Sequence, residues 1–109
     1  MKVQPNENEY IISPEAESIS QFLQQLEAAY SDFLSKNIIV DLTTAQPTLK
    51  EVELFQSIHD QHIANHKSFV IVVDGFDFNE ATEGLNLVPT LQEAYDVIEI
   101  DEIQRDLGF

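Results

Sequence analysis

Stretches of almost uninterrupted apolar residues mark the expected strands of this chain. Residues 37–42 and 67–73 are apolar almost throughout, which is typical of strands buried on both faces of a sheet. A shorter run at residues 85–88 predicts a further, short strand. Near the start, residues 2–4 and 9–12 flank the turn-forming sequence Pro-Asn-Glu-Asn and predict an antiparallel hairpin.

The first helix is predicted from apolar residues that recur at steps of three and four. This spacing places side chains on one helix face, which is expected to lie against the core. A start near Ser13 and Pro14 is expected, because serine can cap free backbone amides and proline is tolerated in the first turn. The predicted core face consists of Ile19, Phe22, Leu23, Leu26, Tyr30, Phe33 and Leu34.

Two later helices each begin with a threonine that is followed three residues on by a glutamate. In this capping box the two residues satisfy each other's free amides. Thr48 opens a helix expected to run to about His66, and Thr90 opens a last helix expected to end near Gly108. The apolar stripe of the last helix is Leu91, Ala94, Tyr95, Ile98, Ile103 and Leu107. A short additional helix is predicted at residues 77–84.

The order of these elements predicts an α/β fold. Residues 37–73 form a strand, a helix and a strand, a unit that should pair its strands in parallel through a right-handed crossover. With the hairpin added, this unit predicts a mixed sheet of about four to five strands packed with about four helices. The 109 residues of the chain, 1–109, are expected to form a single domain.

Composition narrows the classes of function. The 20 acidic and 5 basic residues give a net charge of -15, which repels phosphate backbones and anionic membranes. We therefore expect no direct nucleic-acid or membrane binding, and the charge serves either solubility or the steering of a basic partner. The lack of cysteine excludes a disulfide framework, a thiolate metal site and a cysteine nucleophile. No apolar stretch has signal-peptide or membrane-spanning length, so a cytoplasmic protein is expected.

Three segments carry a resemblance to a known family. Residues 37–43 end in Asp-Leu-Thr, and residues 68–73 are followed by residues 85–90 and the last helix. This arrangement resembles the STAS domain, the fold of bacterial anti-sigma-factor antagonists and of the cytoplasmic tail of sulfate transporters, in which a strand ends in Asp-Leu-Ser. The resemblance covers nearly the whole chain and implies a STAS-like module that works by binding another protein.

The end of the chain carries a second resemblance. Residues 88–96, Val-Pro-Thr-Leu-Gln-Glu-Ala-Tyr-Asp, and residues 103–109, Ile-Gln-Arg-Asp-Leu-Gly-Phe, are similar to a group of short Bacteroidetes proteins often labelled ribonuclease Z. That enzyme needs a metallo-β-lactamase core and a His-x-His-x-Asp-His zinc cluster, and this sequence has neither. We therefore expect no nuclease activity. The label instead supports an alternative, an accessory or regulatory domain associated with ribonuclease Z.

The STAS-like resemblance also implies where a partner binds. In the antagonists a serine at the start of the helix after the Asp-Leu-Ser strand is phosphorylated by the partner kinase, which switches binding. The matching residues 47–52 contain no serine. The implied partner-binding surface is Thr43, Thr44, Thr48 and Lys50, with an anti-sigma-factor or kinase-like protein as the partner. Thr48 is the candidate phosphoacceptor, although helix capping accounts for it more simply.

His59, His62 and His66 are the sharpest chemical signal in the sequence. Steps of three and four place them in one stripe of the predicted helix, where two imidazoles could bind a metal ion. Apolar residues on the same helix favour a simpler interpretation, in which these rings line the edge of the core or are exposed to solvent. We therefore predict no metal site. If the protein does bind a metal ion, the three histidines are the candidate ligands. Protonation near pH 6 is expected to affect this helix in either case.

Asp41 and Asp74 follow the two central strands, at the edge where ligands of open α/β sheets tend to bind. No lysine is placed to complete a magnesium site there, and an Asp-Gly pair is an ordinary turn. The sequence also lacks a phosphate-binding glycine loop and an arguable serine, histidine and acid set. We therefore expect no cofactor and no catalytic residue, and the chain is not predicted to be an enzyme.

The last helix has a strongly acidic exterior that is interrupted by apolar residues. Val97 and Ile100 fall off its main apolar stripe, so they belong either to a docking site with an acidic rim or to a wider buried face. The leading hypothesis is a STAS-like interaction module. An accessory domain for ribonuclease Z is the competing hypothesis, and a small enzyme or ligand-binding domain comes last.

Overall fold

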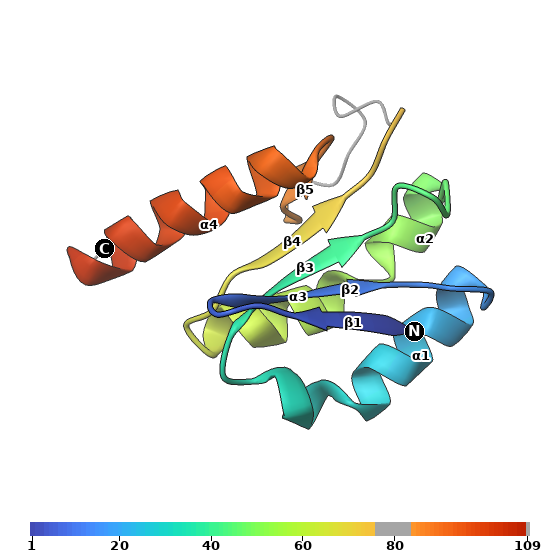
Figure 1. The fold of residues 1–109 in the computed structure, drawn as a ribbon, viewed down its shortest axis with the longest axis horizontal. Coiled ribbons are helices and arrows are strands. Elements are labelled where there is room, and N and C mark those ends of the chain that lie inside the picture. Colours follow the sequence, from blue (N-terminus) through green and yellow to red (C-terminus); the bar gives the residue numbers. More distant parts are fainter. Residues whose placement is uncertain (76–83, 109) are drawn as a thin grey trace.

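A five-stranded mixed sheet forms the centre of the computed structural model, which describes residues 1–75 and 84–108 (Figure 1). The strands lie side by side in sequence order. Their bounds are β1 Lys2–Pro5, β2 Glu9–Ser13, β3 Asn37–Asp41, β4 Phe69–Val72 and β5 Leu87–Val88. β1 and β2 are antiparallel, and each later pair of neighbours is parallel. The predicted hairpin, the parallel pairing of β3 with β4 and the α/β class are confirmed.

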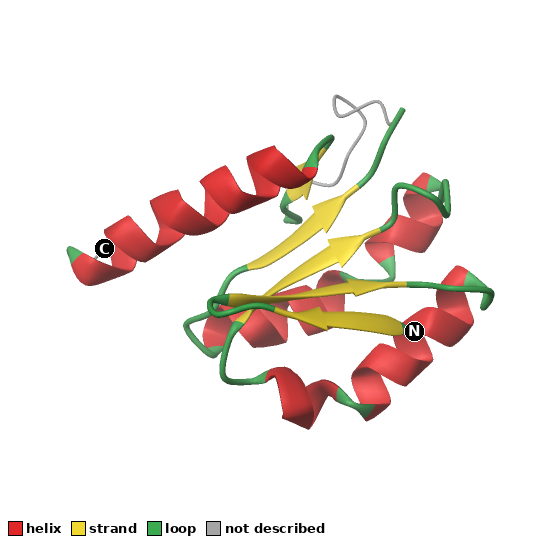
Figure 2. Ribbon diagram, viewed as in Figure 1, coloured by secondary structure: helices red, strands yellow, loops and turns green. Residues whose placement is uncertain are grey.

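Helices pack on both faces of this sheet (Figure 2). Their bounds are α1 Ile19–Ala28, α2 Leu49–Glu53, α3 Gln56–Ala64 and α4 Leu91–Asp106. Among the helices of the described residues, α1, α2 and α3 lie on one face and α4 lies by itself on the other (Figure 1). None of these helices is long and apolar enough to cross a membrane. The helix predicted at residues 77–84 falls almost entirely outside the described residues.

The first helix begins later than predicted. Ser13 is the last residue of β2 and pairs with Lys2 across the hairpin, so its backbone is extended. The helix starts after Ser18, whose hydroxyl accepts a hydrogen bond from the Gln21 amide at 3.2 Å. The Gln21 side chain in turn accepts one from the Ser18 amide at 3.1 Å. The predicted start at Ser13 is wrong because two serines offered a cap, and sheet pairing uses the first of them.

The apolar face predicted for residues 19–34 spans more than one helix. α1 ends at Ala28, and a 3-10 helix follows at Tyr30–Phe33. The predicted face is buried as far as Phe33, whereas Leu34 is 41% exposed. Leu34 lies just beyond the 3-10 helix, whose tighter winding changes the direction of the side chains that follow.

The helix predicted from Thr48 to His66 is two helices. α2 ends at Glu53, and the amides of Leu54 and Phe55 then bond to carbonyl oxygens three residues back, at 3.3 and 3.1 Å. This tight turn leaves Leu54 49% exposed and buries Phe55 completely. No glycine or proline marks the break. The break therefore coincides with the burial of the Phe55 ring, and no helix-breaking residue in the sequence indicates it.

Two hydrophobic clusters hold helices against the sheet. The larger cluster lies between the sheet and α1 to α3, and it includes the fully buried rings of Phe22, Phe55 and Phe69. The smaller cluster lies between the sheet and α4, whose buried residues are Ala94 and Ile98. Successive residues of a strand point to opposite faces, so β3 and β4 contribute to both clusters.

Candidate functional site

The residues predicted to bind a partner lie at the edge of the sheet where β3 ends. Asp41 is the last residue of β3, and its Oδ1 accepts hydrogen bonds from the Thr43 amide at 3.0 Å and from the Thr43 hydroxyl at 2.7 Å. Thr43 is half-buried, and its hydroxyl proton is used in the bond to Asp41. Both side chains hold the loop in shape. Asp74 follows β4 at the same edge of the sheet and is exposed.

Thr48 caps α2 through both hydrogen bonds of a capping box. Its hydroxyl accepts a bond from the Glu51 amide at 3.2 Å, and its own amide donates to the Glu51 carboxylate at 2.9 Å. The capping prediction is confirmed. Thr48 and the nearby Lys50 are both exposed, so the start of α2 presents these side chains to solvent. The Thr48 hydroxyl accepts in the capping box and keeps its own proton available to donate.

The loop between Thr43 and Thr48 contains a residue with a strained backbone. Gln46 has a φ of 47°, in the left-handed region that costs a non-glycine residue about 1–2 kcal/mol. Pro47 beside it is buried, while Thr44 is exposed. A cleft of about 250 Å³ is lined by Thr44, Ala45 and Glu51 together with five residues that follow β2: Pro14, Glu15, Glu17, Ser18 and Ile19. The loops after β2 and β3 are thus brought together around this cleft.

His62 has a structural role in the core. It is fully buried, with Nδ1 2.7 Å from the Tyr30 hydroxyl and Nε2 2.8 Å from the Lys36 carbonyl oxygen. A carbonyl oxygen can only accept, so Nε2 carries the proton and Nδ1 accepts a bond from tyrosine. Burial lowers the pKa of His62, which keeps the ring neutral at neutral pH. Its packing against the core agrees with the simpler interpretation of the sequence.

His59 shares the buried stripe of α3 with His62, and both rings pack edge-on against Phe69, whereas His66 lies outside the helix. His59 is buried, and its Nδ1 lies 2.9 Å from a carboxylate oxygen of Asp60, a contact that lowers the pKa of Asp60. His66 lies beyond α3 with a φ of 63° and is exposed. Its amide bonds to the Ile63 carbonyl oxygen at 2.9 Å. This bond belongs to a Schellman motif, in which histidine takes the position usually held by glycine.

The three histidines therefore do not form one shared site. Within residues 1–75 and 84–108, no group of three or more histidine and carboxylate side chains is placed to hold a metal ion. His59 and His62 line the core, whereas His66 is exposed to solvent, because the helix ends before reaching it. A helical spacing in the sequence places side chains on one face only as far as the helix continues.

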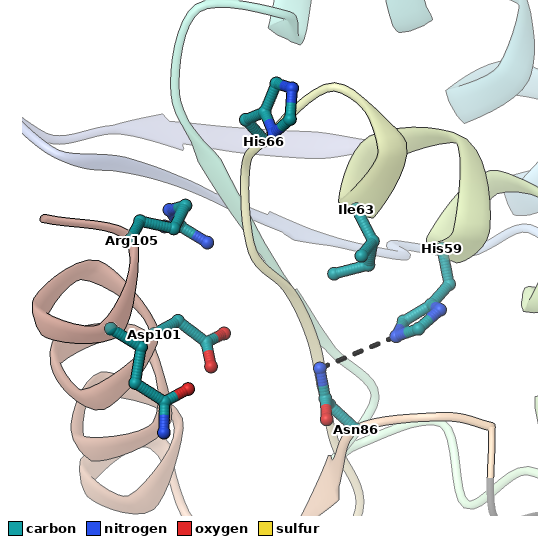
Figure 3. Close-up of a pocket in the computed structure, with 7 residues that line it drawn as sticks. His59, Ile63, His66, Asn86, Asp101 and Arg105 are labelled. Atoms are coloured by element: carbon teal, nitrogen blue, oxygen red, sulfur yellow. Dashed lines mark hydrogen bonds between the residues drawn. The ribbon is translucent and has the colours of Figure 1, made fainter. Parts of the chain in front are cut away.

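A second cleft, of about 440 Å³, opens between α3 and α4 (Figure 3). His59 points toward Asn86 on one side, with Nε2 3.5 Å from the Asn86 amide nitrogen, while Asp101 and Arg105 reach in from α4 (Figure 3). The Asn86 amide also donates to the Phe69 carbonyl oxygen at 3.3 Å. The cleft therefore mixes donors and acceptors, and several of them already have partners within the protein.

The polar groups beside this cleft anchor α4 to the sheet. Ser68, buried just before β4, donates from its hydroxyl to Asp101 at 2.7 Å. Arg105 lies 3.3 Å from the Ser68 hydroxyl and 3.5 Å from the Asn37 side-chain oxygen. The Ser68 amide donates to the same Asn37 oxygen at 2.8 Å. These bonds fix the C-terminal half of α4 against the amino ends of β3 and β4.

None of these anchoring residues was predicted from the sequence. The available signal was the position of Asn37 and Ser68, each at the start of a predicted central strand, because neighbouring parallel strands bring their first residues together. Comparison with known proteins adds no further assignment: no protein-family model matches the chain, and no curated protein matches it significantly.

Proposed function

We propose that the protein is a STAS-like interaction module that binds a partner protein through the loops at the carboxyl edge of its sheet. The proposed surface consists of Thr44, Gln46, Thr48 and Lys50, with Thr43 holding the loop behind them. The order of elements supports the resemblance, since a hairpin is followed by helices that alternate with parallel strands. Ligands of open α/β sheets tend to bind beyond the carboxyl ends of the strands, where these residues lie.

The observation that carries this proposal is the left-handed backbone of Gln46. Such strain persists only where the surrounding structure holds it, and it tends to occur at functional sites. Buried Pro47 and the Thr48 cap fix one end of the loop, and the hydrogen bonds of Thr43 fix the other. The loop is therefore preformed, and a preformed surface binds without first losing the entropy of a mobile one.

We further propose that binding does not depend on phosphorylation. Thr48 stays the candidate phosphoacceptor, but a phosphate on its oxygen would bring nearly two negative charges close to Glu51. It would also disturb the hydrogen bond from the Glu51 amide that begins α2. In this proposal Thr48 acts first as a helix cap, and the chain itself carries out no catalytic step.

The proposal is tested by capturing partners with the full chain from native lysate, followed by mass spectrometry. Thr44→Arg and Lys50→Glu change the proposed surface at exposed positions, and Leu34→Ser, at an exposed position before the amino end of β3, is the control. We expect a partner that both surface variants lose and the control keeps. An anti-sigma-factor or kinase-like partner supports the STAS-like module, whereas ribonuclease Z supports the accessory domain. A partner retained by both surface variants contradicts the proposed surface.

A variant of Thr48 separates capping from contact with the partner. Thr48→Ala is expected to lower the free energy of unfolding by about 1 kcal/mol, because the Glu51 amide loses its acceptor, whereas Thr48→Ser keeps the cap. Urea denaturation measures both effects. Unchanged stability of Thr48→Ala combined with lost partner binding would show that the hydroxyl serves the partner and not the helix.

A further inference from the structure

α4 and its C-cap residue, Leu107, expose three large apolar side chains in one line; the Leu107 amide still bonds to the Ile103 carbonyl oxygen at 3.1 Å, so it continues the helical turn. Ile100, Ile103 and Leu107 are 55%, 51% and 66% exposed. Steps of three and four residues place them on the same side of the helix. Ala94 and Ile98 lie on the opposite side, where they are buried against the sheet. We call the three exposed residues the outer stripe of α4.

The outer stripe corrects the pattern expected from the sequence. Ile103 and Leu107 were predicted to continue the core-facing stripe, but Asp101 and Arg105 take the inward positions in this half of the helix through their bonds to Ser68. Polar anchoring of the helix thus turns apolar residues toward solvent. Val97, by contrast, packs against the smaller cluster, so it belongs to the buried face.

Unpaired negative charge borders the outer stripe. Glu93, Asp96, Glu99 and Asp106 are exposed, and none forms an ion pair with another described residue. Arg105 is the only basic residue of α4, and its guanidinium is directed at Ser68 and Asn37 on the inner side. The outer side therefore combines an apolar line with acidic borders that lack a cation.

We infer that the outer stripe of α4 docks an amphipathic helix of a partner whose apolar residues are bordered by lysine and arginine. Side chains at steps of three and four form ridges that pack into the grooves of a second helix. Basic borders on the partner match the acidic borders here and speed their encounter. A second copy of this chain is disfavoured, because it would bring the same carboxylates face to face.

This surface is separate from the one proposed above. α4 covers the face of the sheet opposite to α2, whose start carries Thr48 and Lys50 (Figure 1). The inference therefore goes beyond the proposed function, and each surface can be tested without altering the other.

The test titrates the full chain, labelled with nitrogen-15, with a synthetic helical peptide of about 18 residues. Its leucines stand at steps of three and four, and lysines fill the other positions; a peptide of the same composition in scrambled order is the control. We expect saturable amide shifts around Ile100, Ile103 and Leu107, with at least about tenfold weaker binding of the scrambled peptide. Raising salt from about 50 to about 300 mM should weaken binding by about tenfold.

Three variants locate the binding site. The triple variant Ile100→Ser, Ile103→Ser and Leu107→Ser should lose at least about tenfold in affinity, because the apolar contacts are gone while the charges remain. Glu99→Lys with Asp106→Lys keeps the stripe and should weaken binding and its salt dependence. Leu54→Ser removes an equally exposed apolar residue from the other face and should change nothing. Thermal melting checks that each variant is folded.

Three outcomes would overturn the inference. The first is equal binding of the scrambled peptide, which would mean that charge alone attracts it. The second is a set of shifts confined to residues 44–50, which would move the site to the loop surface. The third is a concentration-dependent dimer that Ile103→Ser abolishes, which would identify a second copy of the chain as the occupant.

Discussion

The two faces of the sheet are held in different ways. On one face α1, α2 and α3 bury a large cluster that includes four phenylalanine rings, and on the other α4 buries only Ala94 and Ile98 of its own residues. α4 compensates with polar anchors, among them Ser68 to Asp101 at 2.7 Å and Asn8 to Glu102 at 2.8 Å. Apolar burial contributes most of the free energy of folding, so α4 should be the first element to detach.

The largest expected effect is on the face covered by three helices. Phe55 is fully buried with its ring centroid 6.1 Å from that of Phe22, so Phe55→Ala should lower the free energy of unfolding by about 3–5 kcal/mol. Urea denaturation measures the change. Leu54→Ala, at the exposed neighbouring position, is the control and should stay within about 0.5 kcal/mol of the parent. A loss below about 1 kcal/mol for Phe55→Ala would show that this face is less tightly packed than described.

A smaller and more local effect is expected under α4. Ile98→Ala should cost about 2–3 kcal/mol, because it leaves a cavity between the helix and the sheet. Hydrogen exchange should show the amides of α4 losing protection before those of β3 do. Equal loss of protection in both elements would mean that the two faces open as one unit, and the contrast between them would not hold.

The smallest expected effect is a pH dependence of the free energy of unfolding, which comes from the face covered by α1, α2 and α3. The pKa of buried His62 lies below its usual value of 6.5, so the unfolded chain takes up a proton more readily than the folded one. Above about pH 6.5 the neutral ring contributes fully to the free energy of unfolding. This contribution falls as the pH drops below about 6.5, by at most about 1.4 kcal/mol per pH unit.

The variant His62→Gln isolates this contribution, since the many carboxylates of the chain contribute a pH dependence of their own. The difference in unfolding free energy between parent and variant should shrink from about pH 7.5 to about pH 5.5. Urea denaturation at several pH values gives this difference. A constant difference would mean that His62 is protonated equally in both states.

Much of the fold is predictable from the sequence, because it depends on contacts between near neighbours in the chain. The apolar runs at β3 and β4 and the threonine caps follow local rules, and the structure confirms the strands and the full capping box at Thr48. At Thr90 it confirms the hydrogen bond from the Glu93 amide to the threonine hydroxyl, which is one half of the predicted box. Ser13 was predicted to begin a helix. This prediction failed because the residues next to Ser13 indicate a helix cap but give no information about its pairing with Lys2. The turn before α3 was also missed, because burial of Phe55 depends on the whole core.

The candidate sites also contain both contacts that can be predicted from nearby residues and contacts that cannot. The capping role of Thr48 was visible three residues away, at Glu51. The anchors of α4 join residues 33 to 94 positions apart, such as Ser68 with Asp101 and Asn8 with Glu102, and only the assembled sheet brings them together. The outer stripe of α4 was predicted only in part. Ile100 was one candidate for an exposed docking site, whereas Ile103 and Leu107 were expected in the core, because the orientation of this half of the helix follows from those distant bonds.

The strands lie in the sheet in the order in which they occur along the chain, and this order has a consequence for synthesis. As the ribosome releases the chain, each new strand can join the edge of a sheet that is already present, and the face under α1 to α3 can close early. The opposite face, with Ile39 and Val70, stays uncovered until α4 has been made. A nascent chain that has not yet been extended through α4 thus exposes this hydrophobic surface.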